Sequence, residues 1–122
     1  IKANQISGDQ KVQLSGTISE VLGGIISSVT PGSTLNLIET RTSRGVLRTV
    51  MVSTGVNTRY HLELRLYGKS GSVYALRKLA EDKVGSGTFD VYDLDIAVPR
   101  YTLRFTNAGT VDAYLTWSVV EV

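Results

Sequence analysis

The end of the chain, residues 100–122, has the clearest alternation of hydrophobic and polar positions. Hydrophobic side chains recur at every second position on both sides of a polar segment, TNAGTVD, which has the composition of a turn. The alternating set is Tyr101, Leu103, Phe105, Ala113, Leu115, Trp117 and Val119. A period of two residues is typical of a strand with one buried and one solvent-exposed face. The pattern therefore predicts a hairpin whose inward face carries the only Trp and one of the two Phe residues.

Shorter segments with the same period follow one another along the rest of the chain. One face of residues 59–67 consists of Tyr60, Leu62, Leu64 and Leu66, and the opposite face is charged. Further strands are predicted at residues 12–18, 35–41, 46–53, 73–79 and 89–98. In the last of these segments the phase changes between Val91 and Tyr92, which predicts a β-bulge.

Residues 18–29 allow two interpretations. The helical spacing i, i+3, i+4, i+7 is matched by Ile18, Val21, Leu22, Ile25, Ile26 and Val29, and Thr17 or Ser19 would cap the helix. Against a helix, Gly23 and Gly24 each cost about 1 kcal/mol relative to Ala in a helix interior. The alternative is a pair of extended pieces bent at these two glycines, and we favour it because every other segment is strand-like.

About eight short strands, spaced by roughly 8–12 residues and without a strong helix between them, predict the fold class. We expect an all-β protein, an antiparallel β-sandwich of jelly-roll-like topology, with residues 1–122 as a single domain. Residues 1–18 are predicted to be an extended arm or donor strand that pairs with the edge of a neighbouring subunit. The side chains available for such insertion are Ile6, Val12, Leu14 and Ile18. Pairing of this segment within its own subunit is the alternative.

Composition narrows the class of protein. A chain of 122 residues with 42% hydrophobic and 20% charged residues can bury a core in one domain. It contains no run of roughly 20 apolar residues, the length that a membrane-spanning helix needs. Because it has no Cys, disulfides and cysteine-ligated metals are excluded. A net charge of +2 is too small to indicate nucleic-acid binding. The chain begins at Ile1, which leaves open a trimmed chain or a mature product outside the cytoplasm.

The sequence shows no catalytic motif, and we predict that the protein is not an enzyme and needs no cofactor. His61 is the only histidine, and no GxSxG motif accompanies it. One weak candidate for a metal site remains, a calcium site formed by Asp90, Asp93 and Asp95. Carboxylate oxygens are ligands that calcium prefers, although this spacing is not that of an EF-hand. The alternative is that these side chains are solvated carboxylates on an edge strand.

Charge is distributed unevenly along the chain. Arg41, Arg44 and Arg48 form a basic stretch, whereas residues 81–95 are mainly acidic. If the two stretches occupy opposite ends or edges of the sandwich, they predict complementary surfaces for head-to-tail contact between copies. The alternative is that these charges pair within one subunit.

The closing segment YTLRFTNAGTVDAYLTWSVVEV, together with the composition, resembles small β-sandwich subunits of prokaryotic extracellular filaments and of phage or archaeal virions. The resemblance is one of general style and assigns no functional residue. It implies a non-enzymatic structural role, with copies of the chain or another structural protein of the same assembly as partners. It also implies an extracellular, cell-surface or virion location. The alternative function is a carbohydrate- or ligand-binding module whose tyrosines stack on sugar rings. The candidate tyrosines are Tyr67, Tyr74, Tyr92 and Tyr114.

Overall fold

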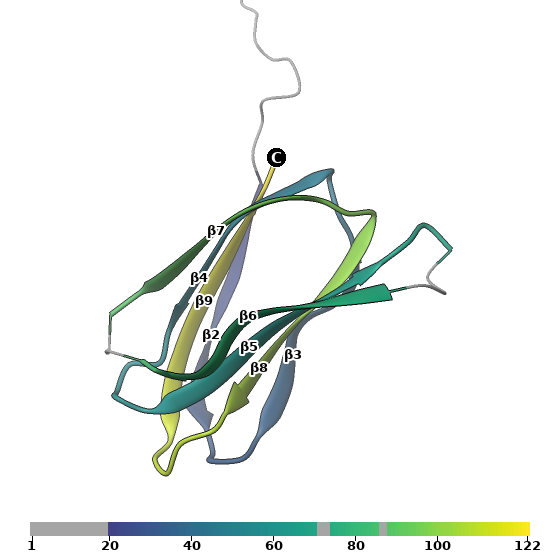
Figure 1. Ribbon diagram of the computed structural model, residues 1–122. Helices are drawn as coiled ribbons and strands as arrows, with labels where there is room; N and C mark the ends of the chain where they lie inside the picture. The colour runs from purple at the N-terminus through teal and green to yellow at the C-terminus, as the bar shows by residue number, and fades with distance from the viewer. Residues whose placement is uncertain (1–19, 71–73, 86–87) are drawn as a thin grey trace, which may run out of the picture.

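The computed structural model describes residues 20–70, 74–85 and 88–122 (Figure 1). The strands are β2 (Glu20–Val29), β3 (Thr34–Thr42), β4 (Val46–Ser53), β5 (Arg59–Tyr67), β6 (Tyr74–Val84), β7 (Asp90–Ala97), β8 (Arg100–Asn107) and β9 (Ala113–Glu121). The described residues form no helix. Among them there is accordingly no helix with the length and apolar character needed to cross a membrane.

The strands form two four-stranded sheets, in the orders β2-β9-β4-β7 and β3-β8-β5-β6. All pairings are antiparallel. β2 pairs with β9, β3 with β8, β4 with β7 and β5 with β6, as in one long hairpin that has been rolled up. The β4·β9 and β5·β8 pairings then complete the two sheets, which face each other in Figure 1. This arrangement is that of a jelly roll. The predicted all-β sandwich is confirmed.

The inward faces of both sheets contribute to one hydrophobic core. The largest fully buried apolar side chains include Tyr60, Leu62, Leu64, Leu47, Tyr101, Leu103, Phe105 and Leu115. The inward face predicted for residues 59–67 is therefore confirmed. In the centre of the core the rings of Tyr60 and Phe105 stack, with 5.7 Å between their centroids. Full burial of each such side chain contributes about 1.5–3 kcal/mol, so the core dominates the stability of the fold.

The predicted C-terminal hairpin is wrong as a pairing, although its alternation is right. β8 and β9 belong to different sheets: β8 lies between β3 and β5, and β9 lies between β2 and β4. Tyr101 and Leu115 are both fully buried, so each strand presents its hydrophobic face to the space between the sheets. The polar segment after Asn107 connects one sheet to the other. The pairing was mispredicted because alternation reveals which face of a strand is buried but not which strand lies beside it.

The segment that admitted a helix is the single strand β2, so the extended interpretation is confirmed. The expected bend at its two glycines is wrong, because the β2·β9 register stays regular from Glu20 to Ile26 and shifts only before Val29. A Cβ at Gly23 would lie 2.7 Å from the carbonyl oxygen of Trp117, and one at Gly24 would lie 3.3 Å from Trp117 Nε1. The glycines therefore allow β2 to pack closely against β9.

The bulge predicted in β7 is present at a different place. Val91 is exposed and Tyr92 is partly buried, so alternation is unbroken where the phase change was expected. The register of β4 with β7 shifts instead between Leu47 and Thr49. The physical reason is that Val91 is an outward-facing hydrophobic residue, which a count of hydrophobic positions treats as inward.

A buried amide, Asn107, joins the connections at one end of the sandwich. Its side-chain NH₂ donates to the carbonyl oxygens of Val29 at 2.8 Å and Val111 at 2.9 Å. Its Oδ1 accepts from the Thr58 hydroxyl at 3.1 Å and from the backbone N–H of Gly109 at 3.0 Å.

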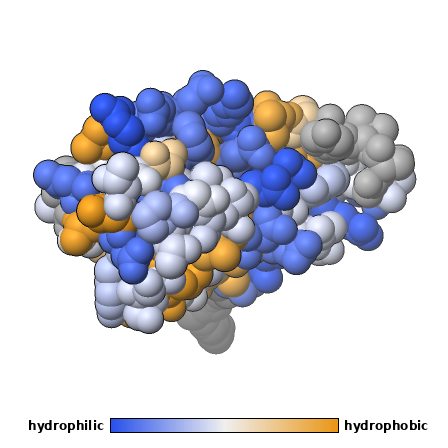
Figure 2. All heavy atoms as spheres, turned by 90° about the horizontal axis from the view of Figure 1, so that it is seen from below, coloured by the Kyte–Doolittle hydropathy of each residue, from blue (hydrophilic) through white to orange (hydrophobic). Residues whose placement is uncertain are grey.

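Figure 2 views the sandwich from below, where the β2–β3 and β8–β9 connections lie, and shows separate hydrophobic patches among mainly hydrophilic residues.

Candidate functional site

Glu121, the last residue of β9, is a fully buried carboxylate that links the two sheets. Arg41 of β3 donates from Nε to Oε2 at 2.8 Å and from Nη2 to Oε1 at 3.1 Å. The backbone N–H of Arg44 donates to Oε1 at 3.2 Å, and the Tyr101 hydroxyl of β8 donates to Oε2. Charged hydrogen bonds of this two-point geometry are among the strongest in proteins. The contact joins β9 to β3 and β8 at the end of the sandwich where β2 begins and β9 ends (Figure 1).

The charges in this cluster stabilise one another. Burial would raise the pKa of Glu121, but hydrogen bonds from Arg41, Tyr101 and the Arg44 backbone outweigh it and hold the pKa below its ordinary value of 4.5. The hydrogen bond to Glu121 raises the pKa of Arg41. Glu20 of β2 adds a second carboxylate, 3.2 Å from Arg41 and 3.3 Å from Arg44. The Arg41–Glu121 pair is therefore ionised at neutral pH, and its charges are satisfied within the subunit.

The three arginines proposed for contact between copies differ in their surroundings. Arg41 and Arg44 bond to Glu20 and Glu121 of the same subunit. Arg48 is exposed, and its Nε lies 3.9 Å from Asp95. Pairing within one subunit thus accounts for Arg41 and Arg44, and Arg48 is the one of the three that has only a long, exposed ion pair. The proposed arm residues, Ile6, Val12, Leu14 and Ile18, lie outside the described residues.

The three aspartates proposed as calcium ligands do not come together. Asp90 lies on the inward side of β7, where its Oδ2 accepts a hydrogen bond from the Tyr60 hydroxyl at 2.7 Å. Asp93 and Asp95 lie on the outward side of the same strand and are exposed. Within the described ranges, no group of three or more His, Cys, Asp or Glu side chains is placed to hold a metal ion. In the described residues these three aspartates therefore do not form one shared ligand set, and the calcium site stays a hypothesis.

Asp90 instead takes part in a second polar link between the sheets. The Tyr60 hydroxyl also lies 2.5 Å from the Tyr92 hydroxyl. Because a phenol has one proton and Tyr60 donates it to Asp90, Tyr92 is the donor of this second bond. Burial raises the pKa of Tyr60, and the bonds to Tyr92 and Asp90 raise it further. This link positions β5 against β7, and its members Asp90 and Tyr92 are half-buried.

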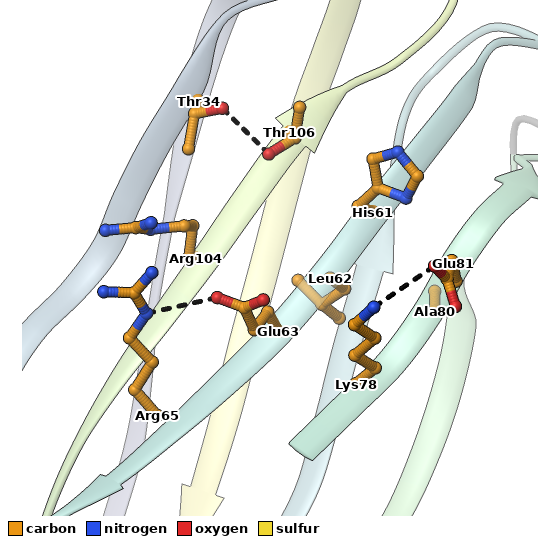
Figure 3. A pocket seen from close by; sticks show the side chains of 10 residues that line it. All are labelled: Thr34, His61, Leu62, Glu63, Arg65, Lys78, Ala80, Glu81, Arg104 and Thr106. Atoms are coloured by element: carbon orange, nitrogen blue, oxygen red, sulfur yellow. Dashed lines mark hydrogen bonds and ion pairs between the residues drawn. The ribbon is translucent and has the colours of Figure 1, made fainter. Parts of the chain in front are cut away.

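A shallow polar groove of about 300 Å³ lies on the outward face of the β3-β8-β5-β6 sheet (Figure 3). Its lining residues are Thr34, His61, Leu62, Glu63, Arg65, Lys78, Ala80, Glu81, Arg104 and Thr106. Most of its charged groups have neighbours of opposite charge: Arg65 Nε lies 3.2 Å from Glu63, and Lys78 Nζ lies 3.2 Å from Glu81. The groove can contact a polar surface, and it presents both signs of charge.

The one histidine lines this groove and is bonded to the backbone of β6. His61 Nδ1 accepts a hydrogen bond from the backbone N–H of Asp82 at 2.9 Å. The hydroxyls of Thr34 and Thr106, also in the groove, bond to each other at 2.9 Å. The bond from the Asp82 backbone occupies His61 Nδ1, and these are the polar contacts of a sheet surface.

The tyrosines proposed to stack on sugars do not form a row. Tyr92 turns its hydroxyl inward to Tyr60. Tyr114 is 50% exposed but lies near the start of β9, whereas Tyr67 ends β5 in the other sheet. The side chain of Tyr74 lies outside the described part of the structure. A carbohydrate-binding platform needs neighbouring exposed aromatic faces, and the described tyrosines do not supply one.

The outward faces of the two sheets differ in character. On the β2-β9-β4-β7 sheet, Val21, Ile25 and Val91 are 66%, 62% and 54% exposed. The outward charges among the described residues of those strands are Arg48, Asp93 and Asp95, near its β7 side. The other sheet carries charged residues on all four strands, many of them around the groove. One outward face therefore carries exposed apolar side chains, and the other is mainly charged.

Sequence reasoning missed Glu121, the buried carboxylate that accepts hydrogen bonds from Arg41, Arg44 and Tyr101. A usable signal was present: Glu121 is in phase with Leu115 and Val119 on an inward face, and an inward carboxylate requires a cationic partner. It also missed Asn107, which is in phase with the buried Leu103 and Phe105. In both cases a polar residue at an inward position marks a buried polar link.

Comparisons with known proteins identify the fold. No family model and no curated protein matches this sequence. Among solved structures, the infectious bursal disease virus VP2 subviral particle is similar over 97% of this chain and 37% of its own chain, with 16% identity and a TM-score of 0.55. The T13 viral particle of the same virus is similar over 92% and 35%, with 14% identity and a TM-score of 0.53. This chain therefore spans about a third of the length of those chains, and the likeness concerns the fold.

Proposed function

We propose that this chain is a non-enzymatic structural subunit of a virion surface, or of a comparable extracellular assembly. Its partners are copies of itself or another structural protein of the same assembly. The observation that carries the proposal is the exposed apolar side of the β2-β9-β4-β7 sheet, where Val21 and Ile25 are 66% and 62% exposed. Such a surface favours a permanent partner, because covering it gains about 25 cal/mol per Å² of apolar area.

The likeness to viral particle proteins supports the proposal by analogy. The similar structures are of a subviral particle and a viral particle, and each aligns with nearly the whole of this chain. A jelly roll also hosts unrelated functions, including sugar binding. The described surface favours assembly over sugar binding, since it has an apolar side and no row of exposed aromatic side chains.

Two further contacts belong to the proposed assembly. The arm, residues 1–18, adds as an extended strand to the edge of a neighbouring sheet, with Ile6, Val12, Leu14 and Ile18 as its inserted side chains. The charge-complementary contact between copies involves Arg48 and the charged residues of the groove. Arg41 and Arg44 are not available for it, because they are paired with Glu20 and Glu121 of the same subunit.

Electron microscopy of the purified protein, with light scattering over a concentration series, tests this function. We expect filaments, tubes or closed shells, or oligomers that grow with concentration. A chain lacking residues 1–18 should assemble less while keeping the β-rich circular dichroism of the full chain. A full chain that stays monomeric at every concentration would contradict assembly with copies of itself.

A further inference from the structure

Among the described strands, four form the edges of the two sheets, and three of them carry features that discourage pairing with another chain. β6 has Arg77, Lys78, Glu81, Asp82 and Lys83. β7 has Asp90, Asp93 and Asp95. β3 contains Glu39 and two register irregularities. Charges and bulges are the usual means by which edge strands avoid association.

The fourth edge, β2, has fewer of these features, with one register irregularity near its end, between Ile26 and Val29. Its sequence, EVLGGIISSV, has no Pro and a single charge at its first residue. That charge, Glu20, is held by Arg41 and Arg44 of the same subunit and does not guard the edge. Among the described strands β2 pairs on one side only, with β9. Its outward side chains are Val21, Gly23, Ile25 and Ser27, none of them charged. An edge strand of 10 residues without a charged outward side chain is suited to accept another strand.

The outward-facing apolar residues of β2 are placed symmetrically about Gly23, with Val21 two residues before it and Ile25 two residues after it. In an antiparallel pair of two β2 strands, residues directly opposite share a face. With Gly23 opposite Gly23 of the second copy, Val21 of each strand lies opposite Ile25 of the other. This is the register that pairs the two exposed apolar side chains of β2 with each other, since Val21 and Ile25 are equally distant from Gly23.

We propose that β2 of one copy pairs antiparallel with β2 of a second copy about a two-fold axis at Gly23. The two β2-β9-β4-β7 sheets then form one continuous sheet across the pair, and the apolar residues Val21 and Ile25 of both copies cover one another. An interface of this kind is isologous, with the same patch on both subunits. The inference rests on the proposed function, and it names the edge, the partner and the register.

The glycine at the axis has a role inside the subunit as well. A Cβ at Gly23 would lie 2.7 Å from the Trp117 carbonyl oxygen, so substitution there disturbs the subunit itself. Substitutions that test the interface therefore belong at Val21 and Ile25, whose exposed side chains contribute little to the core. Val91 is the matched control, because it is 54% exposed on the same outward face at the opposite edge.

Sedimentation equilibrium of the full chain and of Val21→Lys, Ile25→Lys and Val91→Lys tests the edge. A lysine opposite an apolar residue disfavours pairing. We expect the dissociation constant to rise at least about tenfold for the first two variants and to stay unchanged for Val91→Lys. If Val21→Lys and Ile25→Lys associate as the full chain does, the β2 edge is not the interface, and the proposed assembly is left standing. If the full chain is monomeric throughout, the β2 pairing and the assembly of this chain with copies of itself both fail.

The register has its own test, because the chain contains no cysteine. Opposed Cβ atoms in a strand pair lie about 4.5–5.5 Å apart, close to the distance that a disulfide spans. Val21 of the two copies would be offset by four residues, about 13 Å along the strands. Oxidation of a mixture of Val21→Cys and Ile25→Cys chains, one with a small mass tag, should therefore give the mixed dimer. Disulfide dimers of either variant alone, or none at all, would overturn the register at Gly23.

Discussion

Arg41 of β3 and Glu121 of β9 form a two-point ion pair that joins the two sheets across 80 residues of sequence. The carboxylate is fully buried, and the guanidinium is 28% exposed. An intact buried ion pair contributes little net stability, because its attraction only offsets the cost of removing both charges from water. Removing one partner is strongly destabilising, because the other charge then stays buried without compensation. This link fixes the end of β9. β9 lies beside β2, the strand that we propose pairs with a second copy.

Replacing Arg41 with leucine should destabilise the subunit strongly. The change leaves Glu121 buried without its main counter-charge, at an expected cost of about 3 kcal/mol in the free energy of unfolding. Arg48→Leu is the matched control, since its ion pair with Asp95 is long and exposed, and it should cost less than about 1 kcal/mol. Urea denaturation at neutral pH measures both. Equal stabilities of the two variants would show that the Arg41–Glu121 pair has no special weight.

The same carboxylate makes stability depend on pH. The pKa of Glu121 is lower in the folded protein than its ordinary value of 4.5, so folding favours the ionised form. Its contribution is fully present above pH 4.5 and is lost as the pH falls through the lowered folded pKa. Glu121→Gln should therefore be less stable than the full chain at neutral pH, with a difference that shrinks in acid. Urea titrations from neutral to acidic pH check this, and a constant difference would contradict it.

Asn107 should be as sensitive to substitution as a core residue. Asn107→Ala leaves the carbonyl oxygens of Val29 and Val111 and the Thr58 hydroxyl without their bonds. Unpaired buried groups cost about 1–3 kcal/mol each, so the loss should be about 3 kcal/mol after relaxation. The melting temperature should fall by roughly 10 °C. Asn36→Ala is the control, because Asn36 is exposed and accepts one bond from Arg104. Similar melting temperatures for the two variants would argue against the network.

The buried faces of the strands could be predicted from the sequence because alternation is a local property. Tyr60, Leu62 and Leu64 are buried as their spacing predicts. The partner of each strand could not be predicted in this way. β8 and β9 follow each other in sequence, yet each pairs with strands far away along the chain, since a short polar segment can turn back or cross between sheets that pack about 10 Å apart.

The candidate site was harder to predict because bulges change which residues point inward. Strict alternation from Leu35 would turn Glu39 inward, but the register of β3 with β8 shifts on both sides of Ile38. Thr40 adopts a positive φ of 47°, and Arg41 then points toward Glu121. Spacing alone shows Arg41 and Arg44 as a basic stretch, and the structure shows them as partners of buried or nearby carboxylates.

Chelation tests the calcium hypothesis directly. Asp90 faces Tyr60, whereas Asp93 and Asp95 face outward, so one ion cannot bind all three carboxylates in this arrangement. We expect the same melting temperature with added calcium and with a chelator. A lower melting temperature in chelator that calcium restores would show a site that the described arrangement does not contain.

Tyrosine ionisation should report the two polar links between the sheets. Burial raises the pKa of Tyr60 and Tyr101 above the ordinary value of 10, and hydrogen bonds to Asp90 and Glu121 respectively raise it further. Folding therefore favours the neutral phenols, and this contribution to stability is present below pH 10 and lost as the pH rises above it. In an alkaline titration, part of the tyrosinate absorbance should appear only together with the loss of β-sheet circular dichroism. Tyr60→Phe and Tyr101→Phe should each reduce that late part. An absorbance change that is complete while the sheets remain folded would mean that these hydroxyls are accessible to solvent and that the two links are open in solution.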